Sequence, residues 1–299
     1  MHQKNNFKTF LVILIFSSLT LNCQEKEQLD VPYVPTPMPV VEGMMRLAEI
    51  QKDDILYDLG CGDGRILITA ARKYGIRGVG VDLDPERIRE CRENAKKAEV
   101  DHLVQFYQKN LFHTDFHEAT IVTLYLLPSV NIQLRPKLLD ELSPGTKVIS
   151  HDFDMDEWLA DESIQVWADD EIHMLYFWEV PANVSGTWDL SFNKPLNGYE
   201  PEQLQFQQIF QFPQGNVVIK EDHIAIQDEK LEGNKLAFSF LYSGLKWELD
   251  GAFSRESMKG TARLSGTQRT VSWKAERRSG TKKPLAPHSI DPDSIKENF

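Results

Sequence analysis

The sequence is short of the features that mark several large classes of protein. Its three cysteines, Cys23, Cys61 and Cys91, lack the paired spacing of a zinc site or a disulfide framework, so no metal site is expected. It has no excess of basic residues: 33 Lys and Arg against 45 Asp and Glu give a net charge of −12. This balance argues against nucleic acid as a partner and is compatible with a neutral or cationic one, or with solubility alone.

The sequence also has no apolar run of the roughly 20 residues that span a bilayer as a helix. Its N-terminal run, residues 10–21, would reach about 18 Å as a helix, against about 30 Å of hydrocarbon. Lys4 and Lys8 precede the run and Cys23 follows it, as in a bacterial lipoprotein signal peptide. We therefore expect residues 1–23 to be such a signal and Cys23 to carry a lipid anchor, with the protein facing the periplasm or the cell surface. The alternatives are an uncleaved short anchor and a position on the cytoplasmic face of the membrane.

Residues 45–181 alternate between short apolar strands and helices. Residues 24–44 are a proline-rich segment that leads into an amphipathic helix over 40–50. Strands are then predicted at 55–58, 78–82, 103–107, 119–124 and 147–150, with helices at 64–74, 85–98 and 130–142. This alternation is typical of a doubly wound parallel sheet, and residues 164–168 and 171–180 predict an antiparallel hairpin that closes it.

The pattern changes after Pro181. Alternating runs at 187–192, 204–212, 216–219, 236–242, 246–253, 258–264 and 270–275 predict a small all-β antiparallel domain over residues 182–278, a barrel or a sandwich. Trp188, Trp247 and Trp273 fall inside these strands, and we expect them to fill the core, with a ligand box as the alternative. Residues 279–299 are polar and proline-bearing, and are predicted to be disordered.

The stretch DLGCGDG at residues 58–64 follows the first strand and opens the first helix of the alternation. Glycine at Gly60, Gly62 and Gly64 lets the backbone approach a ligand that a Cβ atom would exclude. Asp58 would repel a pyrophosphate but suits the cationic methionine end of S-adenosylmethionine (SAM), and Asp82, which ends the second strand, can accept both ribose hydroxyls. The glycine spacing and the terminal hairpin disfavour a nicotinamide oxidoreductase. These five residues therefore predict a SAM site.

Short motifs over residues 31–158 are shared with a known family. They are VPYVP at 31–35, DLGCGDGR at 58–65, LF at 111–112, LPSV at 127–130, KL at 137–138, EL at 141–142, GTKVIS at 145–150, Phe153 and Trp158. In these motifs the chain resembles class I methyltransferases of the mitochondrial protein-lysine type, which modify the c-type subunit of ATP synthase and the ADP/ATP carrier. A wider set of bacterial methyltransferases is similar in YLLP at 125–128 and SHDF at 150–153.

The resemblance implies an α/β fold: a class I methyltransferase (Rossmann-like) sheet with a terminal antiparallel hairpin, here followed by the small all-β domain. It also implies that the segment containing Tyr33 and Thr36 closes over the methyl-donor side of SAM. Asn110 stands where the family usually has Asp near adenine N6, and its carbonyl can accept the same hydrogen bond.

Three residues are candidates on the acceptor side. Tyr125 lies at the end of the fourth strand, where ligands meet an open α/β sheet, and either contacts the methyl acceptor or forms an aromatic wall. Asn131 and His151 lie at similar strand-end loops; His151 is either a general base or a structural hydrogen-bonding residue. Asp152 is expected to cap the segment that follows.

The leading interpretation is a SAM-dependent methyltransferase acting on a protein lysine side chain, with a small-molecule acceptor as the alternative substrate. Such a reaction needs no nucleophile from the enzyme, because holding the amine and the methyl group in position supplies most of the rate. The second interpretation is a catalytically degenerate SAM-fold lipoprotein that binds a ligand or partner. Export would favour this second interpretation, because SAM is made in the cytoplasm.

Overall fold

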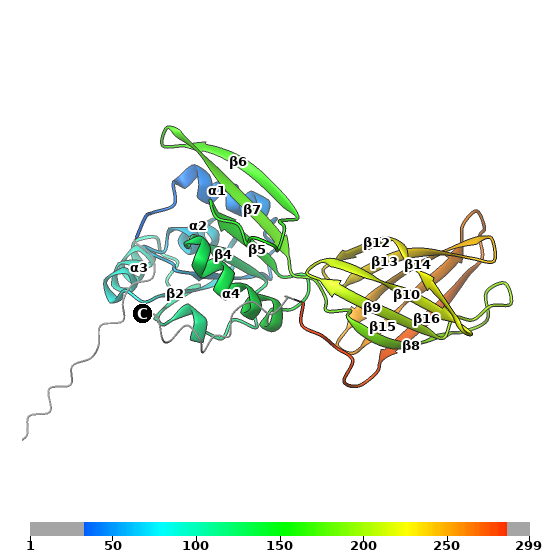
Figure 1. Ribbon diagram of the computed structural model, residues 1–299. Coiled ribbons are helices and arrows are strands. Elements are labelled where there is room, and N and C mark those ends of the chain that lie inside the picture. Colours follow the sequence, from blue (N-terminus) through cyan, green and yellow to red (C-terminus); the bar gives the residue numbers. More distant parts are fainter. Residues whose placement is uncertain (1–32, 286–299) are drawn as a thin grey trace, which may run out of the picture.

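Seven strands form the first sheet (Figure 1), in the order β3-β2-β1-β4-β5-β7-β6, in a computed structural model that describes residues 33–285. The strands are β1 (Ile55–Leu59), β2 (Arg77–Asp82), β3 (Val104–Gln108), β4 (Ile121–Leu124), β5 (Lys147–His151), β6 (Glu162–Ala168) and β7 (Glu171–Glu179). Strands β1 to β5 are parallel, whereas β7 runs antiparallel to both β5 and β6. This confirms the predicted parallel sheet with a terminal antiparallel hairpin.

The helices that accompany this sheet are α1 (Met38–Leu47), α2 (Arg65–Tyr74), α3 (Pro85–Lys97) and α4 (Pro128–Glu141), with a short 3-10 helix η1 (Leu111–His113) after β3. Local sequence explains where they begin. The side chain of Asp84 caps α3 by accepting the Glu86 N–H at 2.8 Å, and Pro85 occupies the first turn, where no N–H is needed. Helix α1 begins at Met38, inside the segment that the sequence assigned to the proline-rich stretch, and packs on the sheet.

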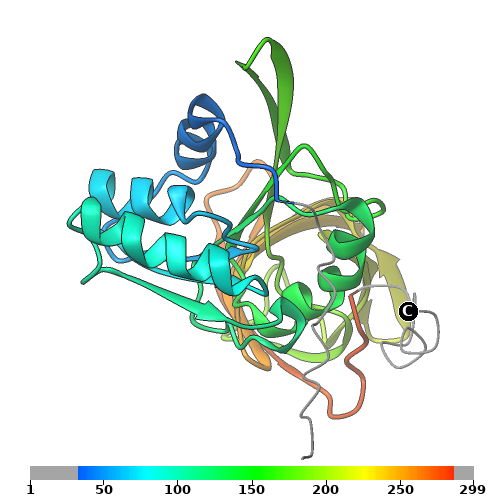
Figure 2. The same cartoon turned by 90° about the vertical axis from the view of Figure 1, so that its left-hand side faces the viewer.

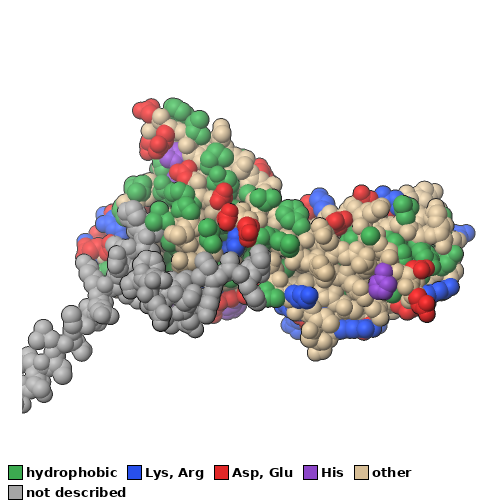
Figure 3. Space-filling model, viewed as in Figure 1, with side chains coloured by type: hydrophobic (Ala, Val, Ile, Leu, Met, Phe, Trp, Pro, Cys, Tyr) green, Lys and Arg blue, Asp and Glu red, His purple; other side chains and the backbone are tan. Residues whose placement is uncertain are grey.

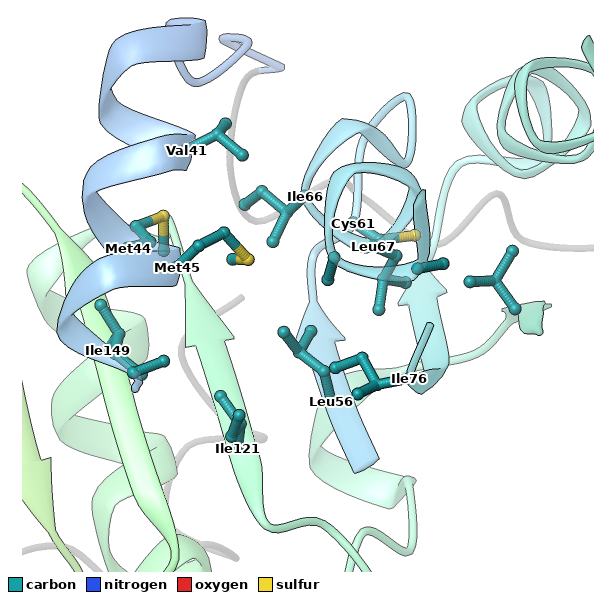
Figure 4. Close-up of a cluster of buried hydrophobic side chains, with 14 of the residues drawn as sticks. Val41, Met44, Met45, Leu56, Cys61, Ile66, Leu67, Ile76, Ile121 and Ile149 are labelled. Carbon is teal, nitrogen blue, oxygen red and sulfur yellow. The ribbon is translucent and has the colours of Figure 1, made fainter. Parts of the chain in front are cut away.

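One face of the sheet packs against α1, α2 and α3 (Figure 4). Leu56, Ile121 and Ile149 come from adjacent strands β1, β4 and β5 and lie beneath Met45 of α1 and Ile66 of α2. Because successive strand residues point to opposite faces, their neighbours in the chain face α4 on the other side. There Val122 and Val148 pack in a second cluster with buried residues of α4. The carboxyl ends of the parallel strands are thus held at one edge between two layers of helices.

Nine strands form a second, wholly antiparallel sheet, in the order β11-β10-β9-β8-β16-β15-β14-β13-β12. They are β8 (Gly186–Phe192), β9 (Gln203–Ile209), β10 (Phe212–Ile219), β11 (Asp222–Ala225), β12 (Gln227–Glu232), β13 (Lys235–Tyr242), β14 (Leu245–Ser254), β15 (Ser257–Leu264) and β16 (Thr270–Arg277). Figure 2 shows this sheet strongly curved. Trp188, Trp247 and Trp273 are buried together in its core, as expected. The predicted all-β part is therefore confirmed.

The two sheets are joined through a buried contact that the sequence did not predict. Phe210, at the turn between β9 and β10, is 1% exposed and belongs to the same apolar cluster as the α4 face of the first sheet. Its ring stacks on Trp158 with centroids 6.3 Å apart, and the guanidinium of Arg135 lies 5.1 Å from the ring centroid. Gln211 donates to the Leu159 carbonyl at 2.8 Å. Packing and hydrogen bonding thus both connect the two parts.

Three expectations about the C-terminal part need correction. The run 204–212, expected as one strand, contains the end of β9, a turn at Phe210 (φ 51°) and the start of β10, because Phe210 turns inward against the first sheet. Strands β11 and β12 were missed because they carry few buried side chains. Residues 279–285, expected to be disordered, pack instead: Leu285 is buried and its carbonyl accepts the Phe210 N–H at 3.2 Å. The division of the chain near Pro181 stays a prediction.

The N-terminal signal expected over residues 1–23, and with it Cys23, lies outside the described residues, as do residues 286–299. The space-filling view draws these outer residues in grey (Figure 3). Within residues 33–285, no helix has both the length and the apolar character that crossing a membrane requires.

Candidate functional site

The glycine loop between β1 and α2 is held in a conformation that side chains would disturb. Gly60 and Gly62 have φ values of 87° and 53°, in the left-handed region that favours glycine. A Cβ atom on Gly60 would lie 2.9 Å from the Leu126 side chain, and one on Gly62 would lie 2.7 Å from the Tyr33 ring. The loop therefore presents bare backbone to the space beside it, as a cofactor cradle requires.

A pocket opens at this loop, at the carboxyl ends of the parallel strands. Six residues predicted from the sequence line it: Tyr33, Thr36, Asp58, Gly60, Gly62 and Tyr125. The other lining residues are Val34, Pro35, Cys61, Asp63, Arg65, Ile66, Leu126, Leu127 and Phe153. Gly64, Asp82, Asn110, Asn131 and His151 are not in the lining. The structure thus gathers part of the predicted site into one pocket and places the rest around it.

Asp58 supplies a buried carboxylate to this pocket. Its Oδ1 accepts the Thr123 hydroxyl at 2.8 Å, whereas its Oδ2 is buried and has no hydrogen-bond partner among the described residues. Burial raises the pKa of Asp58 to about 7. An unpartnered acceptor atom of this kind, on a residue that lines the pocket, is suited to a cationic group of a ligand.

Asp82, at the end of β2, supports the glycine loop from behind. Its Oδ2 accepts the Gly62 N–H and its Oδ1 accepts the Asp84 N–H, both at 2.9 Å. Burial raises the pKa of the Asp82 carboxyl. Gly64 plays a structural part here too, as the left-handed residue before α2 whose missing side chain admits Phe106 and Cys91.

Asn110 ends the loop after β3. Its side-chain carbonyl accepts the Phe112 N–H at 2.9 Å and so caps η1. The oxygen expected to accept an adenine amino group therefore already has one partner, and its second lone pair is the acceptor capacity that remains.

A short segment before α1 covers the glycine loop. Arg65 donates from Nη1 to the Thr36 carbonyl at 2.9 Å and forms an ion pair with Asp63 at 2.7 Å. The Tyr33 ring lies over Gly62, with the guanidinium carbon of Arg87 4.5 Å from its centroid. Arg65 and Arg87 thus hold the segment that contains Tyr33 and Thr36 in place over the glycine loop. Neither arginine was singled out from the sequence, although Arg65 ends the motif at residues 58–65.

The rings of Tyr125 and His151 are in contact, with centroids 3.8 Å apart and planes tilted by 34°, and the Phe153 ring centroid lies 6.2 Å from that of Tyr125, on the pocket side. His151 itself is fully buried, and its Nδ1 lies 3.2 Å from the Thr36 hydroxyl. Burial lowers the pKa of His151 to about 4, so its imidazole is neutral at pH 7. His151 therefore contacts two residues of the pocket lining, Thr36 and Tyr125, but does not line the pocket itself. Its predicted catalytic role is not tested by this arrangement and stays a prediction.

Asn131, on α4, is also fully buried. Its Nδ2 lies within hydrogen-bond distance of the Ser150 hydroxyl and of the carbonyls of Phe153 and Asp154, at 3.2–3.3 Å. Asn131 thus fixes the loop that carries Phe153 into the pocket. Thr123 and Phe153 were missed as site residues; a polar side chain inside an apolar strand was the available signal for Thr123.

Comparison with known proteins agrees with this geometry. A family model described as the ANTKMT methyltransferase domain matches residues 58–162. A protein-lysine N-methyltransferase of Saccharolobus islandicus is 46% identical over 151 residues, which cover 50% of this chain and 94% of that protein. An adenine nucleotide translocase lysine N-methyltransferase of Mus musculus is 32% identical, over 48% of this chain and 64% of that protein. A solved RNA methyltransferase from Salinibacter ruber in complex with S-adenosyl-L-homocysteine is 52% identical over 50% of this chain and 96% of that one, with a TM-score of 0.48.

The family match and the relatives define the class: this is a SAM-dependent methyltransferase. Because the archaeal relative is matched over 94% of its length at 46% identity, the family follows as well. The chain belongs to the protein-lysine N-methyltransferase family. The alternative of a degenerate SAM-fold binding module receives no support from these comparisons.

Proposed function

We propose that the protein transfers the methyl group of SAM to a lysine side chain of another protein. The observation that carries the proposal is the Oδ2 of Asp58, buried and unpartnered within residues 33–285, on a residue that lines one pocket together with the glycine loop and Tyr125. The similarity to protein-lysine N-methyltransferases supports the choice of acceptor. The family model matches residues 58–162, which lie within the part of the chain that forms the first sheet, so the contribution of the second sheet to substrate choice is open to experiment.

The residues of the pocket fit the two ends of SAM. Asp58 would hold the α-ammonium group, and the backbone of Gly60 and Gly62 would lie along the cofactor. Asp82 can offer its remaining lone pairs to the ribose hydroxyls, and the second lone pair of the Asn110 side-chain carbonyl would accept from the adenine amino group. When bound, SAM supplies an electrophilic methyl group on a sulfonium centre.

The acceptor side of the pocket is apolar and aromatic. Tyr125, Leu126, Leu127 and Phe153 line it, and the ring of His151 packs against Tyr125. A lysine must be uncharged to act as a nucleophile, and burial against such a wall lowers the pKa of an ammonium group. The chain thus contributes orientation and desolvation, which is what this transfer needs from an enzyme.

The proposal is tested with methyl-labelled SAM and protein substrates that contain lysine. Label should appear in a protein substrate as mono-, di- or trimethyl-lysine by mass spectrometry, and Asp58→Asn should abolish it while keeping the size of the side chain. If label appears only in small molecules, the methyl acceptor is a small molecule and not a protein lysine. If the wild-type protein binds SAM but transfers label to no acceptor, the proposed methyltransferase activity is contradicted.

We propose further that the protein is a lipoprotein anchored to the membrane at Cys23. Support comes from the sequence alone: Lys4 and Lys8, the short apolar run over 10–21, and Cys23 directly after it. A single acyl chain binds membranes only marginally, so the several chains of a bacterial lipoprotein matter for stable anchoring. Metabolic labelling with a fatty acid should mark the wild type and not Cys23→Ala; equal labelling of both would overturn the anchor.

A further inference from the structure

Three side chains converge behind Tyr125, outside the pocket. Nε2 of His151 lies 3.0 Å from Nδ1 of His173 and 3.2 Å from Oδ2 of Asp152, and the last two atoms are 3.1 Å apart. His151 ends β5, Asp152 follows it, and His173 lies on the adjacent antiparallel strand β7. Two imidazoles and one carboxylate thus place three potential ligand atoms at the corners of a nearly equilateral triangle.

We propose that this triangle is a binding site for a divalent transition-metal cation. Metal–ligand distances of about 2.0–2.2 Å place neighbouring ligand atoms about 3.0–3.4 Å apart, depending on coordination geometry. A cation about 1 Å above the triangle would lie about 2.1 Å from all three atoms. Two histidines and one carboxylate are a ligand set that suits zinc or iron(II) and leaves further positions open.

The outer atoms of Asp152 and His151 have the hydrogen-bond partners that metal ligands require. Oδ1 of Asp152 accepts the Met174 N–H at 2.8 Å, which leaves Oδ2 for the cation. Nδ1 of His151 lies 3.2 Å from the Thr36 hydroxyl, so a proton on Nδ1 leaves the Nε2 lone pair facing the triangle. Such outer hydrogen bonds fix the tautomer and the direction of metal-binding imidazoles.

Among the described residues His173 lacks such an outer hydrogen bond, but a carboxylate lies near its outer nitrogen. Its Nε2 is buried and has no hydrogen-bond partner within the described chain, and the nearest carboxylate is Glu171, 3.6 Å away. A proton on Nε2 faces that carboxylate and leaves a lone pair on Nδ1, 3.1 Å from the anionic Oδ2 of Asp152. Without a cation, acceptor atoms of two buried histidines and a partly exposed Asp152 would then face one another, which costs free energy. A cation within the triangle removes this repulsion.

The site adjoins the pocket but does not depend on methyl transfer. His151 contacts both Thr36 and Tyr125, so a cation bound to its Nε2 would fix two walls of the pocket. Cysteine spacing gave no sign of a metal site. His151 and Asp152 are adjacent in sequence, but His173 lies 22 residues after His151 and meets them only because β5 and β7 are neighbours.

The test uses the whole chain, stripped with a chelator and titrated with Zn²⁺ by calorimetry and with Co²⁺ by absorption spectroscopy. We expect one equivalent of Zn²⁺ to bind, Co²⁺ to give a visible d–d spectrum, and His173→Gln to weaken Zn²⁺ binding at least about tenfold. Asp152→Asn should also weaken Zn²⁺ binding, because it keeps an oxygen that can accept the Met174 N–H but removes the negative charge.

The matched control is His117→Gln. His117 also pairs with an aspartate, Asp115, at 2.6 Å, but this exposed pair has no third ligand among the residues that the structure describes. It should leave Zn²⁺ binding unchanged, and binding of S-adenosylhomocysteine by the two site variants would show that they are folded. A stripped wild type that takes up no Zn²⁺, or folded site variants that bind Zn²⁺ as well as His117→Gln does, would overturn the proposal and leave a purely hydrogen-bonded cluster.

Discussion

Arg65 ties Thr36 to the glycine loop: its Nη1 donates to the Thr36 carbonyl at 2.9 Å while the same guanidinium pairs with Asp63. One side chain therefore connects the covering segment before α1 to the loop that it covers. The prolines of this segment cannot donate backbone hydrogen bonds, so the contact with Arg65 helps to hold the segment over the pocket, beside the contacts of Tyr33 and of the Thr36 hydroxyl.

Replacing Arg65 with Ala should therefore weaken cofactor binding without unfolding the protein. The guanidinium is partly exposed, so we expect a loss of about 1 kcal/mol, or about fivefold in the Kd for S-adenosylhomocysteine measured by calorimetry. Arg72→Ala is the control, since Arg72 is exposed on the same helix, away from the pocket lining. Equal affinities for the two variants would show that the covering segment does not need Arg65.

The affinity for SAM should rise with pH through about 7. In the free protein burial raises the pKa of Asp58 from 3.8 to about 7, and only the ionised carboxylate attracts an ammonium group strongly. Between about pH 6 and pH 7 the Kd should fall by up to about tenfold, and Asp58→Asn should bind more weakly, with a flatter profile. Calorimetry at several pH values measures both. If the Kd of Asp58→Asn depends on pH as steeply as that of the wild type, then the titrating group is not Asp58.

The raised pKa of Asp58 also predicts how the stability of the protein depends on pH. Because the folded pKa is about 7 and the ordinary value 3.8, the folded protein keeps a proton that the unfolded chain loses between these values. The contribution of Asp58 to stability therefore falls as pH rises through this window. A bound ammonium group stabilises the carboxylate, so S-adenosylhomocysteine should raise Tm more at about pH 8 than at about pH 6. Asp58→Asn should lose this difference.

The cofactor half of the pocket could be predicted because it is encoded locally. Asp58 and the glycines after it lie on one strand–loop–helix connection, so their spacing fixes their relation in space. His173 could not be predicted, since it reaches His151 only through the pairing of β5 with β7. The contact of Phe210 with Trp158 could not be predicted either, because a phenylalanine inside an alternating run gives no sign that the chain turns at that residue.

Replacing Asn110 with Asp should strengthen cofactor binding. The carbonyl of Asn110 already caps η1 through the Phe112 N–H, whereas a carboxylate has a second oxygen free to accept an adenine amino group. We expect the Kd for SAM to fall severalfold, by about 1 kcal/mol, as for an added hydrogen bond. Asn110→Ala is the comparison: it loses the cap and should lower stability by about 0.5–2 kcal/mol. An unchanged Kd in Asn110→Asp would mean that the adenine edge lies elsewhere.

The contact between the two sheets should make them unfold together. Phe210 is 1% exposed, stacked on Trp158 and covered by Arg135, whereas Phe212, two residues further on, is 49% exposed. Removing a buried phenyl ring costs about 3–5 kcal/mol, while a substitution at the surface usually changes stability by about 0.5 kcal/mol or less. Phe210→Ala should therefore lower the free energy of unfolding far more than Phe212→Ala.

The shape of the transition carries more information than its midpoint. In the wild type, calorimetric melting should give a single transition, because the shared cluster couples the two cores. In Phe210→Ala the coupling is weakened, and we expect the transition to broaden or divide into two, with only the first-sheet transition raised by S-adenosylhomocysteine. If Phe210→Ala and Phe212→Ala melt alike in one unchanged transition, then Phe210 is not the residue that couples the two sheets.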